Sequence, residues 1–326
     1  MADFVKLLKQ TNALKQVSLD KKSDRLSHAY LVLTHDKAYL REYLKVFAKL
    51  MLCKEKEFCD SCRLCRQINE EKLTDVKFFP KTVGDKITVD DANEIVTESF
   101  VKPYELKSKL FIIEDICDMN QTAQNKLLKT VEEPPENTFI LIGASSEQGV
   151  LATIKSRVKK IEIPLFEPMQ LFETLIKDCP DEERLKTACY SYDGTIGGTL
   201  ALYGDDKYAL AVSLAESVLV ELNSSKDVLS VTNKITSSGV KILDFLNALE
   251  VLFRDMTVYF NAERLIENAP RTQYFKKTTG YNSPSALFAL TKVSEAKKRE
   301  YFNNNDIMLI ERLLLSILEG KYKWKK

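Results

Sequence analysis

The alternation of short apolar runs with helical patterns is the feature that most restricts what this chain can fold into. Five short runs predict β-strands, over residues 28–33, 76–80, 109–115, 138–144 and 160–163, and the apolar run 28–33 predicts a buried one. Between the runs, apolar residues recur at helical spacing, as Leu40, Leu44 and Phe47 do. Strands separated by helices are typical of βαβ units, in which helices cover both faces of a parallel sheet.

The pattern changes near residue 165, where strand-like runs stop and helical periodicity continues along the chain. We predict an α/β domain over residues 1–165, a small helical domain over 166–206 and an all-helical domain over 207–326. The length of 326 residues suits two or three domains, since domains average about 150 residues. A single amphipathic helix is expected over residues 1–17.

Composition and charge exclude several classes of protein. There are 48 Lys and Arg residues against 47 Asp and Glu residues, and this balance argues against a polycationic nucleic-acid coat protein. No apolar run approaches the ~20 residues that a transmembrane helix needs. The first residues also lack the basic and apolar segments of a secretory signal. We therefore expect a cytoplasmic protein without a membrane partner.

The scarcity of glycine and histidine excludes many kinds of enzyme. The chain has ten glycines, and the first of them is Gly84. A phosphate-binding loop needs glycines, because backbone N–H groups must approach the anion closely, so residues 1–83 hold no such loop. With only two histidines, the chain has no His-rich metal site and no H-E-x-x-H motif, and a G-x-S-x-G motif is absent too.

A cluster of cysteines predicts a metal site. Four of the seven cysteines follow the spacing C-x5-C-x2-C-x2-C, namely Cys53, Cys59, Cys62 and Cys65. Zn²⁺ prefers four thiolates at the corners of a tetrahedron, and closely spaced cysteines on a tight loop can supply them. We predict a structural zinc ion with no open coordination position. Redox sensing and an iron–sulfur cluster are the alternatives, and disulfides are disfavoured in a reducing cytoplasm.

Several motifs together resemble a known family. Residues 121–135 have the sequence QTAQNKLLKTVEEPP; HAYL at residues 28–31 and the cysteine cluster precede it, and Ser156-Arg157 follow it. In this order the motifs resemble the AAA+ subunits of the bacterial sliding-clamp loader. The resemblance implies a RecA-like AAA+ domain over residues 1–165 with a zinc-binding insertion at 53–65. It further implies a helical lid domain (166–206) and a helical collar (207–326) that joins subunits into a ring.

The chain departs from the ATPase members of this family at three places. The stretch that matches their glycine-rich loop, residues 34–41, has no glycine and places Leu40 where they have lysine. Their Asp-Glu pair for Mg²⁺ is reversed to Glu114-Asp115, and the segment 194–198 lacks their arginine. The resemblance thus implies an ATP-independent subunit that binds no ATP and has no intrinsic ATPase activity. This degenerate nucleotide site comprises Thr34, Lys37, Leu40, Glu114 and Asp115.

Those two carboxylates have two interpretations. Glu114 and Asp115 could be the relic of a metal site. Without a phosphate loop, the simpler interpretation is that they cap a neighbouring helix or pair with Lys or Arg.

Arg157 is the one residue to which the resemblance assigns a part in catalysis. Together with Ser156 it matches the family's Ser-Arg-Cys motif, although Val158 replaces the cysteine. In the family this arginine is a finger that reaches the ATP site of the neighbouring subunit. The alternative is that Arg157 only pairs with a carboxylate or packs its aliphatic stem.

The resemblance therefore implies a non-hydrolysing subunit of the DNA polymerase III clamp loader, within the DNA polymerase holoenzyme. Its expected partners are the ATPase subunits (tau/gamma) and the delta subunit, with the sliding clamp contacted indirectly and primed DNA bound through the ring. Two other hypotheses remain: an AAA+ ATPase with an atypical nucleotide loop, and a zinc-containing DNA-binding adaptor that is not part of a ring.

Overall fold

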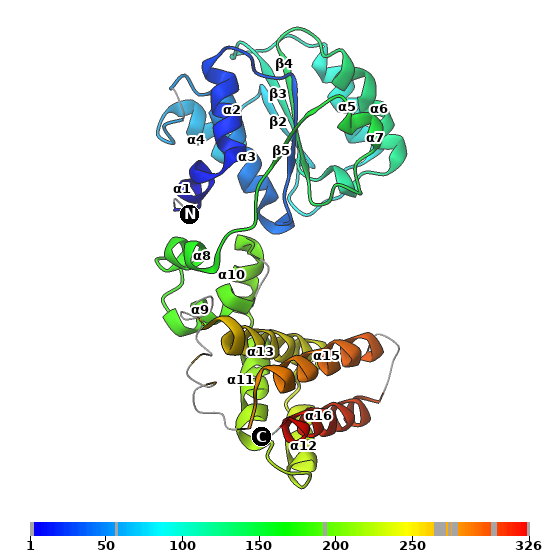
Figure 1. Ribbon diagram of the computed structural model, residues 1–326. Helices are drawn as coiled ribbons and strands as arrows, with labels where there is room; N and C mark the ends of the chain where they lie inside the picture. Colours follow the sequence, from blue (N-terminus) through cyan, green and yellow to red (C-terminus); the bar gives the residue numbers. More distant parts are fainter. Residues whose placement is uncertain are drawn as a thin grey trace. The chain divides into compact units, whose positions relative to one another are not determined.

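A computed structural model describes residues 3–55, 58–191, 194–263, 272, 275, 280–300 and 305–324 of the chain (Figure 1). The chain divides into two compact units. The first comprises Met1–Leu175 with Gly194–Gly198, and the second comprises Ile176–Asp193 with Thr199–Lys326. In the described part of the chain, no helix is both long and apolar enough to span a bilayer.

The first unit is built on a five-stranded parallel sheet with the strand order β2-β3-β4-β1-β5. The strands are β1 (Ala29–Leu33), β2 (Val76–Phe79), β3 (Lys109–Ile113), β4 (Thr138–Ala144) and β5 (Lys159–Glu162). Every residue of β1 and β3 is buried, as expected for strands covered on both faces. All five predicted strands are present, each within two residues of the predicted bounds.

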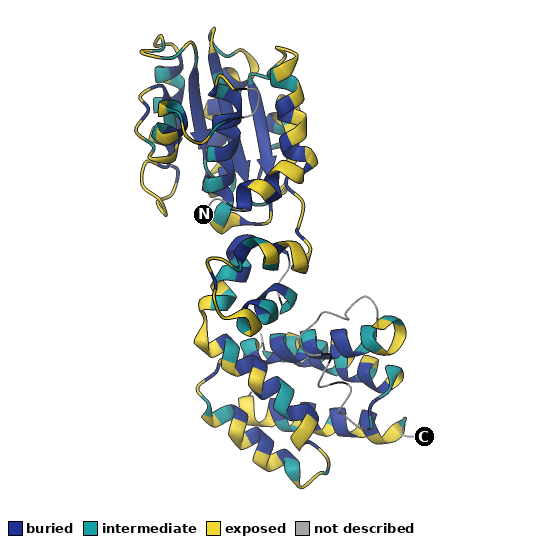
Figure 2. Cartoon of the chain, turned by 90° about the vertical axis from the view of Figure 1, so that its left-hand side faces the viewer, coloured by how far each residue is buried: buried dark blue, intermediate teal, exposed yellow. Residues whose placement is uncertain are grey.

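Helices cover both faces of this sheet (Figure 1). On one side lie α2 (Asn12–Lys22), α3 (Leu40–Leu52) and α4 (Arg63–Asn69); on the other lie α5 (Val89–Ser99), α6 (Gln121–Glu132) and α7 (Ala152–Lys155). Leu31, Phe111 and Ile140 of the sheet pack with Ile95 of α5 and Leu127 of α6 in one apolar cluster. Figure 2 shows the strands buried between helices whose outer faces are exposed.

The start of the chain differs from the prediction. In place of one helix over residues 1–17, two helices form, α1 (Asp3–Gln10) and α2, with Thr11 between them. The Thr11 hydroxyl donates to the Leu8 carbonyl at 2.6 Å and accepts the Leu14 N–H at 3.3 Å. Thr11 is therefore the N-cap of α2, and an N-cap side chain of this kind begins a new helix.

The rest of the chain is helical where it is described. The helices are α8 (Pro168–Leu175), α9 (Glu182–Ser191), α10 (Ile196–Gly204), α11 (Asp206–Glu221), α12 (Asp227–Ser237), α13 (Ile242–Ala262), α15 (Ser283–Glu300) and α16 (Asp306–Lys323). Phe245 and Leu249 of α13 and Ile310 and Leu314 of α16 belong to one buried core. The predicted fold class, an α/β domain with a parallel sheet followed by helical regions, is confirmed. The three-domain boundaries at 165 and 206 stay a prediction.

Candidate functional site

The residues predicted to form a degenerate nucleotide site gather at one edge of the sheet. Thr34 directly follows β1, and Glu114 and Asp115 directly follow β3; β4 lies between these two strands. The carboxyl ends of parallel strands are the usual place for a ligand in such a sheet. A short 3₁₀ helix, η1 (Lys37–Tyr39), occupies the loop between β1 and α3.

Leu40 fills space beside the sheet with an apolar side chain. It is the first residue of α3 and is completely buried. A Cβ atom added at Gly143 of β4 would lie 2.9 Å from Leu40 Cδ1 and 2.1 Å from the Glu114 carbonyl oxygen. Gly143 therefore permits a close approach that any larger residue would block. At the position predicted to match a lysine of the ATPase subunits, the chain thus places a buried hydrocarbon side chain.

Arg41 links Glu114 of this site to Glu71, which lies outside the predicted set. Its Nη1 donates to Glu114 Oε2 at 2.5 Å, and its Nε and Nη2 donate to the two carboxylate oxygens of Glu71 at 2.8 and 2.5 Å. The Arg41 side chain is only 6% exposed. Burial alone would raise the pKa of Glu71, but the hydrogen bonds from Arg41 and Lys45 outweigh it and lower that pKa. The sequence analysis missed this pairing, although Arg41 stood next to Leu40 in the matched loop.

Asp115 is the N-cap of a short 3₁₀ helix, η2 (Ile116–Asp118). Its Oδ1 accepts the N–H groups of Cys117 and Ser145, both at 3.1 Å. Lys37 Nζ lies 3.5 Å from Asp115 Oδ2 and 2.6 Å from Asp118 Oδ1, and the bond to Asp118 raises the pKa of Lys37. The interpretation that the carboxylates after β3 cap a helix or pair with basic residues is confirmed.

Asp36 ties the loop after β1 to the segment Gly194–Gly198. Its Oδ2 accepts the Tyr43 hydroxyl at 2.9 Å and the Gly197 N–H at 3.0 Å, and its Oδ1 accepts the Tyr39 N–H at 3.2 Å. A Cβ atom at Gly197 would lie 2.5 Å from Asp36 Oδ1, so glycine is required for this contact. Nothing in the sequence signals the contact, because the partners are far apart along the chain.

The four clustered cysteines lie together in space. Their sulfur atoms are all within 4.8 Å of one another, and the Cys53 and Cys59 sulfurs are 4.0 Å apart. A tetrahedron with metal–sulfur bonds of about 2.3 Å has edges of about 3.8 Å, so the spacing fits a four-thiolate metal site. It is too long for a disulfide, whose S–S bond is about 2.05 Å. Hydrogen bonds from the backbone N–H groups of Ser61 and Cys62 lower the pKa of Cys59 to about 6.

Two lysines hold the cysteine loop in place. Lys21 Nζ donates to the carbonyl oxygens of Cys53 and Glu55. Lys49, which is buried, forms an ion pair with Asp60 and lies 5.3 Å from the centre of the Phe58 ring. Four thiolates around Zn²⁺ carry a net charge of minus two, and cations nearby lower the cost of burying that charge. The sequence analysis did not single out either lysine, since both belong to other helices.

Arg157 lies apart from the nucleotide site, just after α7. Its Nε forms an ion pair with Glu132 at the end of α6, and its Nη1 donates to the Thr153 carbonyl at 2.8 Å and the Ser156 hydroxyl at 3.1 Å. The side chain is 38% exposed. Pairing with a carboxylate, one of the two interpretations given above, is therefore what the single chain adopts. Ion pairs with this exposure contribute only about 0–1 kcal/mol to the free energy of unfolding.

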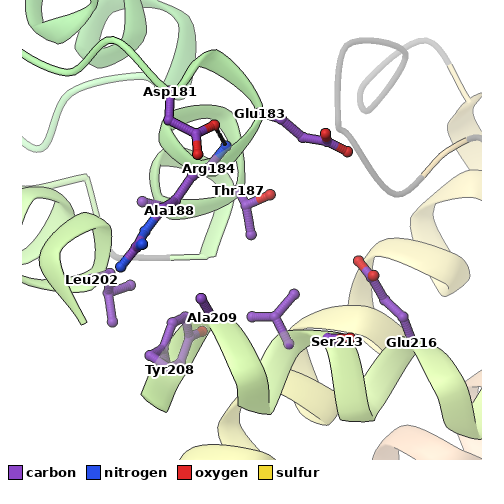
Figure 3. A pocket seen from close by; sticks show the side chains of 11 residues that line it. Asp181, Glu183, Arg184, Thr187, Ala188, Leu202, Tyr208, Ala209, Ser213 and Glu216 are labelled. Carbon is purple, nitrogen blue, oxygen red and sulfur yellow. Dashed lines mark hydrogen bonds between the residues drawn. The ribbon is translucent and has the colours of Figure 1, made fainter. Parts of the chain in front are cut away.

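The second unit contains a pocket of about 370 Å³ between α9, α10 and α11 (Figure 3). Asp181 accepts the Arg184 N–H at 3.0 Å, and Arg184 pairs with Asp206 at 2.8 Å. Glu183 and Glu216 lie on opposite sides of the opening in Figure 3. None of the predicted site residues lines this pocket.

Comparison with known families shows what the first unit of the chain is similar to. Residues 9–167 match the model of a family described as DNA polymerase III, delta subunit. This segment holds the parallel sheet, the loop between β1 and α3, the cysteine cluster and Arg157. The predicted resemblance to subunits of the bacterial clamp loader is confirmed.

Individual relatives are subunits of the same enzyme. The chain is 25% identical to the delta' subunit of DNA polymerase III from Bacillus subtilis, over 95% of this chain and 97% of that one. It is 22% identical to the tau subunit of the same organism, over 96% of this chain but only 60% of tau. It spans about a third (32%) of the gamma/tau subunit of Mycobacterium tuberculosis. A solved protein from Thermotoga maritima, related to the gamma subunit, is 19% identical with a TM-score of 0.39, over 95% of this chain and 100% of that one.

Proposed function

We propose that this chain is a clamp-loader subunit of the delta' type. It binds and hydrolyses no ATP, donates Arg157 to the ATP site of a neighbouring subunit, and takes part in loading the sliding clamp onto primed DNA. Its partners are the tau/gamma ATPase subunits and the delta subunit, and it contacts the clamp and DNA through the assembled ring. Residues 166–206 serve as the lid and residues 207–326 as the collar of this ring.

The observation that carries the proposal is the ion pair between Arg41 and Glu114. In the ATPase relatives of the family, carboxylates at this strand end hold Mg²⁺. Here a guanidinium group, also bound to Glu71, supplies the positive charge. A metal–nucleotide complex would have to displace Arg41 from both carboxylates, and it would meet buried Leu40 in place of a lysine. Losing such buried, charge-assisted bonds is costly, which supports a site that stays empty of nucleotide.

The contacts of Arg157 support a role in trans. Its ion pair with Glu132 lies at the surface and is weak, so a stronger partner can replace it at little cost. The phosphate oxygens of ATP in a neighbouring subunit would be such a partner, because a guanidinium forms two parallel hydrogen bonds with them.

For the cysteine cluster we propose a structural Zn²⁺. The sulfur spacing, the absence of a disulfide among the described cysteines and the adjacent lysines support a closed four-thiolate site. Such a site would stabilise the loop between α3 and α4 and would leave no coordination position for catalysis.

Reconstitution of the ring tests this function. The chain is mixed with the tau/gamma and delta subunits, and co-elution, ATP hydrolysis stimulated by DNA and clamp loading on primed DNA are measured. In the Arg157→Ala ring we expect assembly to persist. Hydrolysis at the site that this chain serves should fall on the order of 10³-fold, with loss of clamp loading.

Glu132→Ala is the matched control, because it removes the ion pair but keeps the guanidinium; its ring should load clamps normally. Unchanged hydrolysis and loading in the Arg157→Ala ring would contradict the finger. Failure of the wild-type chain to co-elute would favour the adaptor hypothesis instead.

A further inference from the structure

A pocket of about 280 Å³ in the first unit lies outside every site described above. It is formed by α1, α2 and α3, and Leu14, Leu19 and Leu50 supply its apolar surface. Leu19 is 64% exposed, so its side chain adds solvent-accessible apolar surface to the pocket. A pocket of this size accommodates one bulky side chain rather than a whole small-molecule cofactor.

Three lysines surround this apolar surface: Lys9 from α1, and Lys15 and Lys22 from α2. In the part of the chain that the structure describes, no ion pair is formed by Lys15 or Lys22, and both are exposed. Asp20, the one carboxylate of α2, is engaged elsewhere, since it pairs with Lys159 at 2.6 Å and accepts the Tyr30 hydroxyl at 2.7 Å. The charge around the pocket is therefore positive and is not neutralised by its own helix.

Ser18 gives an independent sign of a ligand. It lines the pocket and is only 8% exposed, yet its hydroxyl has no hydrogen-bond partner. A serine within a helix usually donates to the carbonyl four residues earlier. A buried hydroxyl without a partner carries a desolvation cost, which an acceptor group entering the pocket would remove.

We propose that this pocket binds an acidic peptide segment of a partner protein. One bulky apolar side chain of the peptide packs on Leu14, Leu19 and Leu50, and neighbouring carboxylates pair with the lysines. A peptide carbonyl accepts the Ser18 hydroxyl. The aliphatic lining favours a peptide over single-stranded nucleic acid, which is bound by stacking on aromatic side chains. Because the pocket uses neither the nucleotide site nor Arg157, this role is additional to the function proposed above.

Fluorescence anisotropy with the full chain tests the proposal. The probe is a fluorescein-labelled nonapeptide of aspartates with a central Leu-Phe, and its asparagine counterpart is the uncharged control. We expect saturable binding of the acidic peptide only, weakened about tenfold or more in the double variant Lys15→Glu/Lys22→Glu. Lys86→Glu/Lys107→Glu makes the same change in net charge at exposed lysines of the same unit, and it should bind like the wild type.

Ser18→Ala separates a ligand contact from a structural role. Since the hydroxyl has no partner in the free chain, the variant should have the melting temperature of the wild type but bind the acidic peptide several-fold more weakly. Absence of saturable binding, or equal binding by Lys15→Glu/Lys22→Glu, would overturn the proposal. Tighter binding of a single-stranded DNA oligonucleotide through the same two lysines would overturn it in favour of a nucleic-acid site.

Discussion

At the scale of single residues, basic side chains near the end of β1 pair with neighbouring carboxylates. Arg41 bridges Glu71 and Glu114, and Lys37 lies near Asp115. These ion pairs neutralise the carboxylates with groups of the chain itself. A buried, bidentate arginine is suited to this, because its guanidinium stays charged and its geometry matches a carboxylate.

Glu71 should make the stability of the first unit depend on pH. The pKa of Glu71 is lowered in the folded chain from its ordinary value of 4.5. Its contribution to the free energy of unfolding is therefore fully present above pH 4.5 and is lost as the pH falls through the lowered pKa. We expect Glu71→Gln to lower the free energy of unfolding by about 1 kcal/mol near pH 7. Between about pH 5 and pH 3, the variant should lose less of its free energy of unfolding than the wild type does. Urea unfolding followed by circular dichroism measures this.

Glu136→Gln is the control, since Glu136 is exposed and no ion pair involves it in the described part of the chain. Parallel acid destabilisation of the wild type and Glu71→Gln would show that Glu71 does not contribute.

At the scale of elements, the loop between α3 and α4 depends on groups outside regular structure. It contributes Cys53, Cys59 and Cys62, and Cys65 lies in α4. Cys62 is also the N-cap of α4, since its sulfur accepts the Cys65 N–H at 3.4 Å. A metal bound there would join the loop to the helix, as structural zinc does in small domains.

Metal analysis and metal release test this element. We expect about one zinc per chain, and faster transfer of zinc to a coloured chelator in Lys49→Met, because the ion pair with Asp60 that holds the cysteine loop is lost. Lys54→Met, in the same loop but exposed, should release zinc at the wild-type rate. Protein purified without chelators that contains no zinc would refute the site, and iron in its place would support the cluster alternative.

Four of the strands were predictable because each is a short, largely apolar run between helical patterns, as in β1 (AYLVL) and β3 (KLFII). The fifth, β5 (KKIE), has only one apolar residue and was placed within one residue of its bounds. The cysteine cluster was predictable because its ligands are close in sequence. The break at Thr11 was missed, since the apolar spacing runs through it and only the cap geometry marks it. The contacts of Arg41 with Glu71 and of Asp36 with Gly197 join distant segments, so no local pattern could predict them.

At the scale of the whole molecule, the chain divides its tasks between two units. The first carries the sheet, the loop between β1 and α3, the cysteine cluster and Arg157; the described part of the second is helical. In the function proposed here, the chain contributes to ATP hydrolysis without taking up ATP. That central claim requires that the edge of the sheet beside Leu40 holds no nucleotide.

Equilibrium binding of a fluorescent ATP analogue, with Mg²⁺, to the isolated chain tests this claim most directly. A tau/gamma ATPase subunit measured under the same conditions serves as the positive control. We expect the control to saturate and this chain to give no saturable signal. Saturable binding to this chain with micromolar affinity would contradict the account.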